Sequence, residues 1–175
     1  MKNEALEVLK NRRSIRRFKP EQISQEVLDV VLEAGTYAPT AAGTQCPVIV
    51  AVQDPDLVAR LDAMNAGILN NQNIPHPYYG APTILIVLAP EDAIVPEIDC
   101  ALAGGNLLNA AYAAGLGSCW IHRSREMFES AEGKALLKQW GLPDTMTAVA
   151  SIALGYPDCP HPQPAPRKSS YIIKV

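Results

Sequence analysis

Two segments made almost entirely of apolar residues constrain the fold of this chain more than any other feature. They are VIVAV at 48–52 and TILIVLAP at 83–90. A strand with one face in water alternates apolar and polar residues, whereas these two segments do not alternate. We therefore predict strands that are covered on both faces, in a chain whose 175 residues are enough for one sizeable core.

Helical patterns alternate with these and two further strand segments. Strands are also predicted at 118–122 (SCWIH) and 148–155 (AVASIALG). The predicted helices share apolar residues at helical spacing or N-cap signals; they span 3–10, the segment from Ser24 to Gly35, 54–65, 97–114 and parts of 124–140. The sequence predicts an α+β domain with three layers.

The helix at 97–114 and the C-terminal segment add two expectations. The helix is apolar nearly all round, which predicts a central position; Asn106, Asn109 and many Ala and Gly residues argue against a membrane span. Residues 157–166 contain five prolines, so 156–175 is expected to be an extended arm of one domain covering 1–175. The last residues, YIIKV, have the composition of a strand but no nearby partner in the sequence.

Charge and cysteine content exclude several classes of protein. The net charge of −3 argues against a general nucleic-acid or membrane-surface binder. Residues 1–20 contain no apolar leader segment, so a cytoplasmic location is expected. The four cysteines are scattered without a C-x-x-C pair, which indicates reduced thiols.

A basic segment near the N-terminus is the first candidate for a binding site. NRRSIRRFKP at 11–20 contains five of the 15 Lys and Arg residues. Guanidinium groups bind phosphate oxygens in pairs, and Arg12, Arg13, Ser14 and Arg16 could converge on one small dianion. The alternative is a solvated charged loop.

Two further segments are candidates with plain alternatives. The loop APTAAGTQ at 38–45 has small residues that allow a flat ligand to approach the backbone, but it could equally be an ordinary turn. In GLGSCWIHR at 115–123 the glycines precede a strand, which excludes a dinucleotide fingerprint. Cys119 and His122 could form a metal site or a catalytic pair, but residues three apart on a strand face opposite sides. We therefore predict no metal ligand.

Taken in order, these segments resemble the FMN-dependent nitroreductase family over almost the whole chain. The matching motifs are RRSIRRF at 12–18, YAPT…Q at 37–45, YGAP at 79–82, D-x-A-L-A-x-x-N-L-L at 99–108, GLGSCWIHR at 115–123, LGYP at 154–157 and PAPRK at 164–168. The resemblance implies a three-layer α/β/α fold with a mostly antiparallel central sheet. It also implies a homodimer in which the C-terminal strand is exchanged and two FMN molecules lie at the subunit interface.

The resemblance also assigns residues to the FMN site. Those implied to bind the phosphate are Arg12, Ser14, Arg16 and Arg167, with Lys168 as an alternative second cation because the usual basic residue is Ala165 here. Those implied to lie along the ring or the ribityl chain are Arg13, Pro39, Thr40, Ala41, Gly43, Gln45, Asn65, Trp120, Ile121, His122 and Arg123. No residue is assigned as catalytic.

The implied activity is hydride transfer from NADH or NADPH through the flavin to a small-molecule acceptor, by a ping-pong mechanism. Nitroaromatics and quinones are among the family's acceptors. Three alternatives remain open at this point. They are a flavin-binding module with little turnover, a specialised flavin enzyme of the same family, and a cysteine- or metal-dependent enzyme built on Cys119 and His122.

Overall fold

The computed structural model describes residues 3–175 and contains one antiparallel sheet between two layers of helices. The strands are β1 (Val48–Val52), β2 (Thr83–Pro90), β3 (Gly117–Ile121) and β4 (Met146–Gly155), in the order β1-β2-β4-β3. The helices are α1 (Glu4–Asn11), α2 (Gln25–Thr36), α3 (Pro55–Leu69), α4 (Pro96–Ala113), α5 (Ser124–Glu129) and α6 (Ala131–Gln139), with short 3-10 turns η1 (Ala41–Gly43) and η2 (Ser169–Tyr171). The predicted α+β class and the predicted three layers are confirmed.

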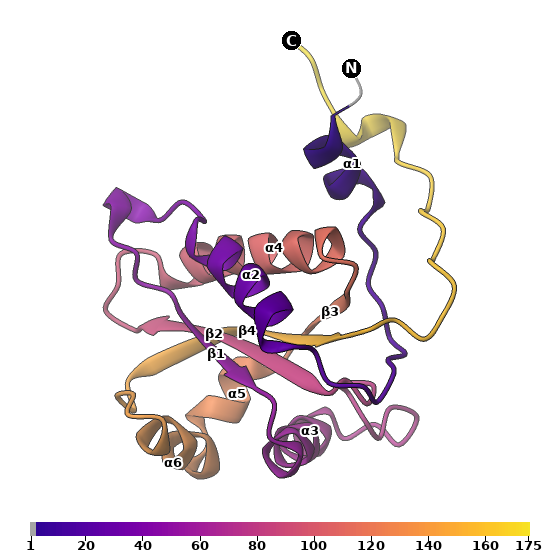
Figure 1. Cartoon of the computed structure of the whole chain (residues 1–175). Coiled ribbons are helices and arrows are strands. Elements are labelled where there is room, and N and C mark those ends of the chain that lie inside the picture. Colours follow the sequence, from indigo (N-terminus) through magenta and orange to yellow (C-terminus); the bar gives the residue numbers. More distant parts are fainter. Residues whose placement is uncertain (1–2) are drawn as a thin grey trace.

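Strand β2 shows why the layers form. Its alternate residues Ile84 and Ile86 belong to one core cluster, while Leu85 and Val87 between them belong to the other, and all four are fully buried. Helices α2 and α4 cover one face of the sheet, and α3, α5 and α6 cover the other (Figure 1). The unbroken apolar run is therefore explained by burial on both faces.

Two helix boundaries differ from the sequence prediction. Helix α3 continues past the predicted end at 65 to Leu69, and Asn70 closes it in the left-handed conformation with φ 46°. The pattern at 124–140 divides into α5 and α6 at Ser130, whose extended backbone ends one helix while its side chain caps the next by accepting from the Gly133 amide. Local capping decided both boundaries.

The segment after β4 runs as an extended arm along α1, at one end of the molecule (Figure 1). His161 fixes it there: its Nε2 lies 2.8 Å from the Asn11 carbonyl oxygen, and its ring lies 5.5 Å from the Tyr112 ring. The predicted strand at 171–175 is not formed within the described chain. Tyr171 closes a 3-10 turn instead, and Ile172 and Ile173 are 71% and 83% exposed.

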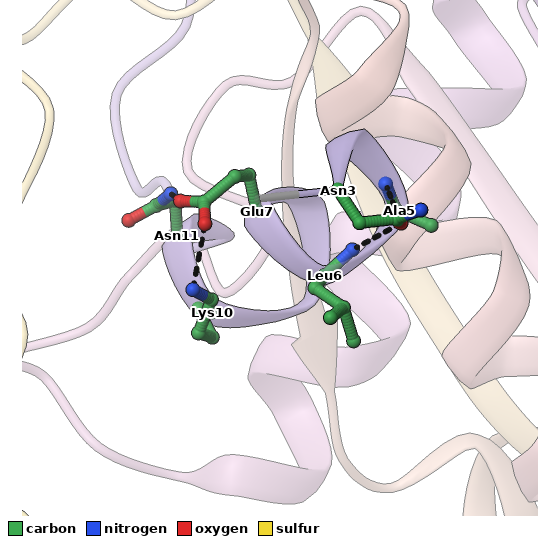
Figure 2. A network of polar contacts seen from close by, with 6 residues as sticks. All are labelled: Asn3, Ala5, Leu6, Glu7, Lys10 and Asn11. Carbon is green, nitrogen blue, oxygen red and sulfur yellow. Dashed lines mark hydrogen bonds and ion pairs between the residues drawn. The ribbon is translucent and has the colours of Figure 1, made fainter. Parts of the chain in front are cut away.

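Helix α1 is held by its polar contacts rather than by burial. Figure 2 shows Asn3 accepting from the amides of Ala5 and Leu6, and Glu7 accepting from Lys10 and Asn11. No residue of α1 is buried. Within residues 3–175, no helix has the combined length and apolarity required to span a membrane.

Candidate functional site

The basic segment that follows α1 is extended and lies along the edge of the sheet. Ser14 forms a parallel bridge with Ser118 of β3, and the Ile15 amide donates to the Ser118 carbonyl at 2.9 Å. Ile15 is buried, so it anchors the segment to the core. Because side chains alternate along an extended backbone, Arg12, Ser14 and Arg16 are presented on a common side.

The two ends of the chain enclose a cavity beside this segment. It measures about 770 Å³, and α1, the basic segment and the C-terminal arm line it. Its lining residues are Leu9, Lys10, Asn11, Arg12, Arg13, Ser14, Pro164, Ala165 and Arg167. Arg167 of the C-terminal arm thus lines the same cavity as Arg12 and Ser14 of the basic segment. Lys168, the alternative second cation, is not among the lining residues.

Arg13 carries an unused donor in this region. Its Nη1 donates to the carbonyl oxygens of Lys10 at 2.8 Å and Arg12 at 2.6 Å, which closes the end of α1. Its Nε is buried without a hydrogen-bond partner. A buried donor without a partner is costly, so this N–H is suited to an additional acceptor.

Arg16 does not line the cavity. Its guanidinium carbon lies 5.9 Å from the centroid of the Tyr79 ring, within the range of a cation–π contact. The neighbouring Cys119 thiol is buried, and burial raises its pKa although Arg16 and Arg12 oppose that shift. Arg16 therefore adds positive charge beyond the cavity, along the β3 side of the basic segment.

The turn after β3 contains the next group of predicted residues. Arg123 has φ 78°, and its Nε donates to Asn65 Oδ1 at 3.0 Å. The amide of Asn65 donates to the His122 carbonyl at 2.8 Å, and Asn65 is fully buried. Asn65 therefore fixes this turn and has no exposed surface for a direct contact with a ligand. His122 is exposed and Arg123 is half-buried.

Two other predicted residues of β3 are mainly core residues. Ile121 is 4% exposed and packs with the α3, α5 and α6 side of the sheet. Trp120 packs on the α4 side, where a Cβ at Gly104 would lie 2.6 Å from its ring. Ile121 is therefore buried in the core, whereas Trp120 stays half-buried.

The side chains of Cys119 and His122 do not share one site in the structure. The Cys119 thiol is buried with a raised pKa, so it is protonated at neutral pH, whereas the His122 side chain is exposed. Within residues 3–175 there is no cluster of three His, Cys, Asp or Glu side chains that could hold a metal ion. The pair therefore lacks the arrangement of a nucleophile with its base.

The loop from Pro39 to Gln45 lies at the opposite end of the molecule from the basic cavity (Figure 1). Thr40 Oγ1 accepts from the Gln45 amide at 2.9 Å, and Ala41 begins the short turn η1. Thr40 and Gln45 line a smaller cavity of about 250 Å³ against α2, β1 and α4. Gly43 has φ 68°, a conformation that suits glycine. Within one chain, this loop and the basic cavity are two separate candidate regions, which we call half-sites.

Sequence reasoning missed two residues at these half-sites. Lys10 lines the basic cavity, although its ammonium group pairs with Glu7 at 2.6 Å. Asp99 lies under the loop, where it accepts from the Ala41 amide. The helical pattern of 3–10 places Lys10 one turn before Arg13, so its position near the basic segment was predictable. Asp99 begins the motif at 99–108, but nothing in that motif indicates its contact with Ala41, 58 residues away.

The chain is a three-layer α+β domain with an antiparallel sheet, and its C-terminal arm lines an arginine-containing cavity beside the basic segment. The model of the nitroreductase family matches residues 9–156 of the chain. The chain belongs to the nitroreductase family. The family expectation drawn from the ordered motifs is thus confirmed.

Individual relatives extend the match over nearly the full length. A provisionally named NADH dehydrogenase/NAD(P)H nitroreductase of Archaeoglobus fulgidus is 30% identical over 161 residues, covering 88% of this chain and 86% of the relative. A nitroreductase of Bacteroides fragilis, solved with bound FMN, has a TM-score of 0.89 at 29% identity, covering 99% of this chain and 100% of that one. A nitroreductase of Desulfitobacterium hafniense, also solved with FMN, has a TM-score of 0.90 at 25% identity and covers 100% of both chains.

Proposed function

We propose that this protein is an FMN-dependent oxidoreductase that takes hydride from NADH or NADPH and passes it to a small-molecule acceptor. The observation that carries the proposal is the basic cavity, which Arg12 and Ser14 line from the N-terminal part of the chain and Arg167 from the C-terminal arm. FMN-bound relatives at 25–29% identity over the whole chain support the same ligand. The predicted acceptors remain nitroaromatics and quinones.

The cavity has the donor set that a phosphate monoester requires. Such a group carries about −1.5 to −2 charges near neutral pH and has three strong acceptor oxygens. Arg12 and Arg167 supply two guanidinium groups, Ser14 a hydroxyl, and the unpartnered Nε of Arg13 one further donor. The Lys10 ammonium is already neutralised by Glu7, so we assign it no direct role.

The remaining residues would serve the ring. His122 and Arg123 lie at the exposed end of β3, and Arg16 is held over the Tyr79 ring nearby. We assign the backbone of this turn to the ring and ribityl chain. The resemblance assigns Arg16 to the phosphate, but Arg16 does not line the cavity, so we propose that its cation lies beside the ribityl chain instead. Asn65 is assigned the positioning of the turn.

A second copy of the chain would complete the site. The half-site formed by 39–45 and the basic cavity lie at opposite ends of one protomer (Figure 1), so a two-fold partner could bring one against the other. Several apolar side chains of α1 and α4 are exposed to solvent. Among them are Leu9 of α1, which is 60% exposed, and Ile98 and Leu102 of α4, which are 58% and 43% exposed. Their burial would provide the driving force for a homodimer with two sites.

The same arrangement gives a role to the C-terminal tail. Strand β1 is an edge of the sheet, so its outer backbone groups are available for pairing. The chain leaves η2 at Ile172 with an extended backbone, and Ile172, Ile173 and Val175 are exposed apolar side chains. We propose that the tail of each protomer pairs with β1 of its partner, as the strand composition of YIIKV suggests.

The division of chemical labour follows from these assignments. Bound FMN would supply the hydride-accepting ring chemistry. The arginines would fix the phosphate, and backbone N–H groups of the turn after β3 would stabilise negative charge on the ring. Donor and acceptor would use the same exposed surface in turn, which is the basis for a ping-pong mechanism. No side chain is assigned as a general acid. The cytoplasmic location of the protein stays a prediction.

The test is the visible spectrum of the purified protein, followed by anaerobic titration with NADH and with NADPH. We expect a yellow protein whose flavin bleaches with one or both nucleotides and recovers its colour with a quinone or a nitroarene. A yellow protein that resists both nucleotides would indicate a flavin-binding module. A colourless protein that does not bind added FMN would refute the proposal.

A further inference from the structure

Asp99 is a buried carboxylate without a cationic partner. It lies in the first turn of α4 and is 2% exposed. Among the residues that the structure describes, no Lys, Arg or His forms an ion pair with it. A buried charge is costly unless hydrogen bonds compensate it, although the positive end of a helix helps. The hydrogen bonds of Asp99 must therefore compensate for the cost of burying its charge.

Those contacts all go to the loop at 39–46. The Ala41 amide donates to both carboxylate oxygens, at 3.0 Å and 3.2 Å. The Cys46 thiol lies 3.3 Å from Oδ2, in position to donate to it. One carboxylate on a rigid 18-residue helix thus holds the beginning and the end of the loop together.

The loop between these two points has an unfavourable backbone. Ala42 has φ 50° and Gln45 has φ 52°, in the left-handed region that is unfavourable for residues other than glycine. Three hydrogen bonds inside the loop offset this cost: Thr40 Oγ1 accepts from the Gln45 amide, the Thr40 carbonyl accepts from the Gly43 amide, and the Ala41 carbonyl accepts from the Thr44 amide. Such a conformation persists only where its surroundings over-determine it.

We propose that Asp99 is a positioning residue that holds this loop in the conformation that receives the flavin ring. The inference rests on the proposed function, because the ring assignment of Thr40 and Gln45 is part of it. By fixing Ala41 and Cys46, Asp99 sets the direction of the backbone groups that face the smaller cavity. It touches neither ligand nor reacting atom itself.

The test compares riboflavin with FMN, since riboflavin has the ring and ribityl chain but no phosphate. We expect Asp99→Asn to weaken the binding of both flavins by the same factor, about tenfold, because one charged hydrogen bond is lost from the ring side only. Glu97→Gln is the matched control: it neutralises an exposed carboxylate in the same turn of α4, which pairs with Arg125 and not with the loop, and its effect should be under about twofold.

A second variant separates positioning from a general loss of stability. Glycine adopts positive φ freely, so Ala42→Gly in the Asp99→Asn background should recover about fivefold of the lost riboflavin affinity. Unchanged riboflavin affinity in folded Asp99→Asn, or a loss confined to FMN, would overturn the proposal. If Asp99→Asn weakened the binding of both flavins and Ala42→Gly did not restore it, Asp99 would act on the overall fold. That result would also overturn the proposal.

A measurement on the unaltered protein keeps the proposal testable if Asp99→Asn does not fold. Ala41 lies in a partly exposed loop, yet its amide donates to a buried carboxylate. We expect the Ala41 amide to exchange its hydrogen at least tenfold more slowly than the Ala42 amide. Comparable rates would refute the proposal that Asp99 holds the loop. This readout needs no flavin, so it stands or falls separately from the proposed function.

Discussion

Replacing Arg167 tests whether the C-terminal arm contributes to the binding of a phosphate. The side chain lines the cavity together with Arg12 and Ser14, although 155 and 153 positions separate it from them in sequence. Arg167→Ala removes one charge-assisted contact and leaves the basic segment in place. Because riboflavin has no phosphate, only the affinity for FMN should fall.

The expected loss of FMN affinity depends on how exposed each arginine side chain is. A hydrogen bond to a charged group contributes about 1.5–3 kcal/mol, which corresponds to about 10- to 150-fold in the dissociation constant. Arg167 is exposed, where water weakens such contacts, so we expect about tenfold. Arg12 is half-buried, so Arg12→Ala should cost nearer to a hundredfold. Since both act on one phosphate, the double variant should lose less than the product of the two factors.

The assay is titration of the apoprotein with FMN and with riboflavin at two salt concentrations. Lys168→Ala is the matched control, because it removes an adjacent cation of the arm that does not line the cavity; its effect on FMN should be under about twofold. If Arg167→Ala weakened both flavins equally, the arm would act through the fold and not through the phosphate. If Lys168→Ala were the more damaging change, the assignment of the second cation would be wrong.

Three further predictions concern the fold and the assembly. Gly133→Ala places a Cβ directly against the Met127 carbonyl oxygen, so we expect a loss of about 3 kcal/mol or more in the free energy of unfolding, measured with urea; Gly67→Ala, whose Cβ meets nothing within 4 Å, should be neutral or stabilising. Burial raises the pKa of Tyr78 to about 12, so the folded protein keeps the phenol proton that the unfolded chain loses above about pH 10. Stability should therefore fall as the pH rises from 10 to 12, and Tyr78→Phe should flatten that part of the profile; an unchanged slope would contradict the shift. Deleting 171–175 should convert the dimer to monomers in sedimentation velocity runs at micromolar concentration, and an intact truncated dimer would exclude strand exchange.

The layered fold could be predicted because burial on two faces leaves a direct trace in the sequence. The strands at 48–52 and 83–90 occur with the predicted boundaries, since each apolar run is as long as the strand itself. The helix at 54–65 was predicted too short, because Gly67 and the polar, proline-containing run that begins at Asn70 resemble a loop, while residues 66–69 still complete α3. The order of the strands was not predictable from the segments, since every antiparallel pairing satisfies the same apolar pattern.

The half-sites divide in the same way. Arg12 and Ser14 could be assigned because they are neighbours in sequence and extended backbone presents them together. Asp99 could not be found from the residues, because its value depends on a contact with Ala41 across 58 positions and its own helix explains it as an ordinary first-turn acid. Local chemistry therefore predicts candidate binding groups, whereas the residues that position them depend on tertiary contacts. In this chain the small residues at 39–45 alone do not distinguish an ordinary turn from part of a binding site, and the contact between Asp99 and Ala41 is the observation that supports the second interpretation.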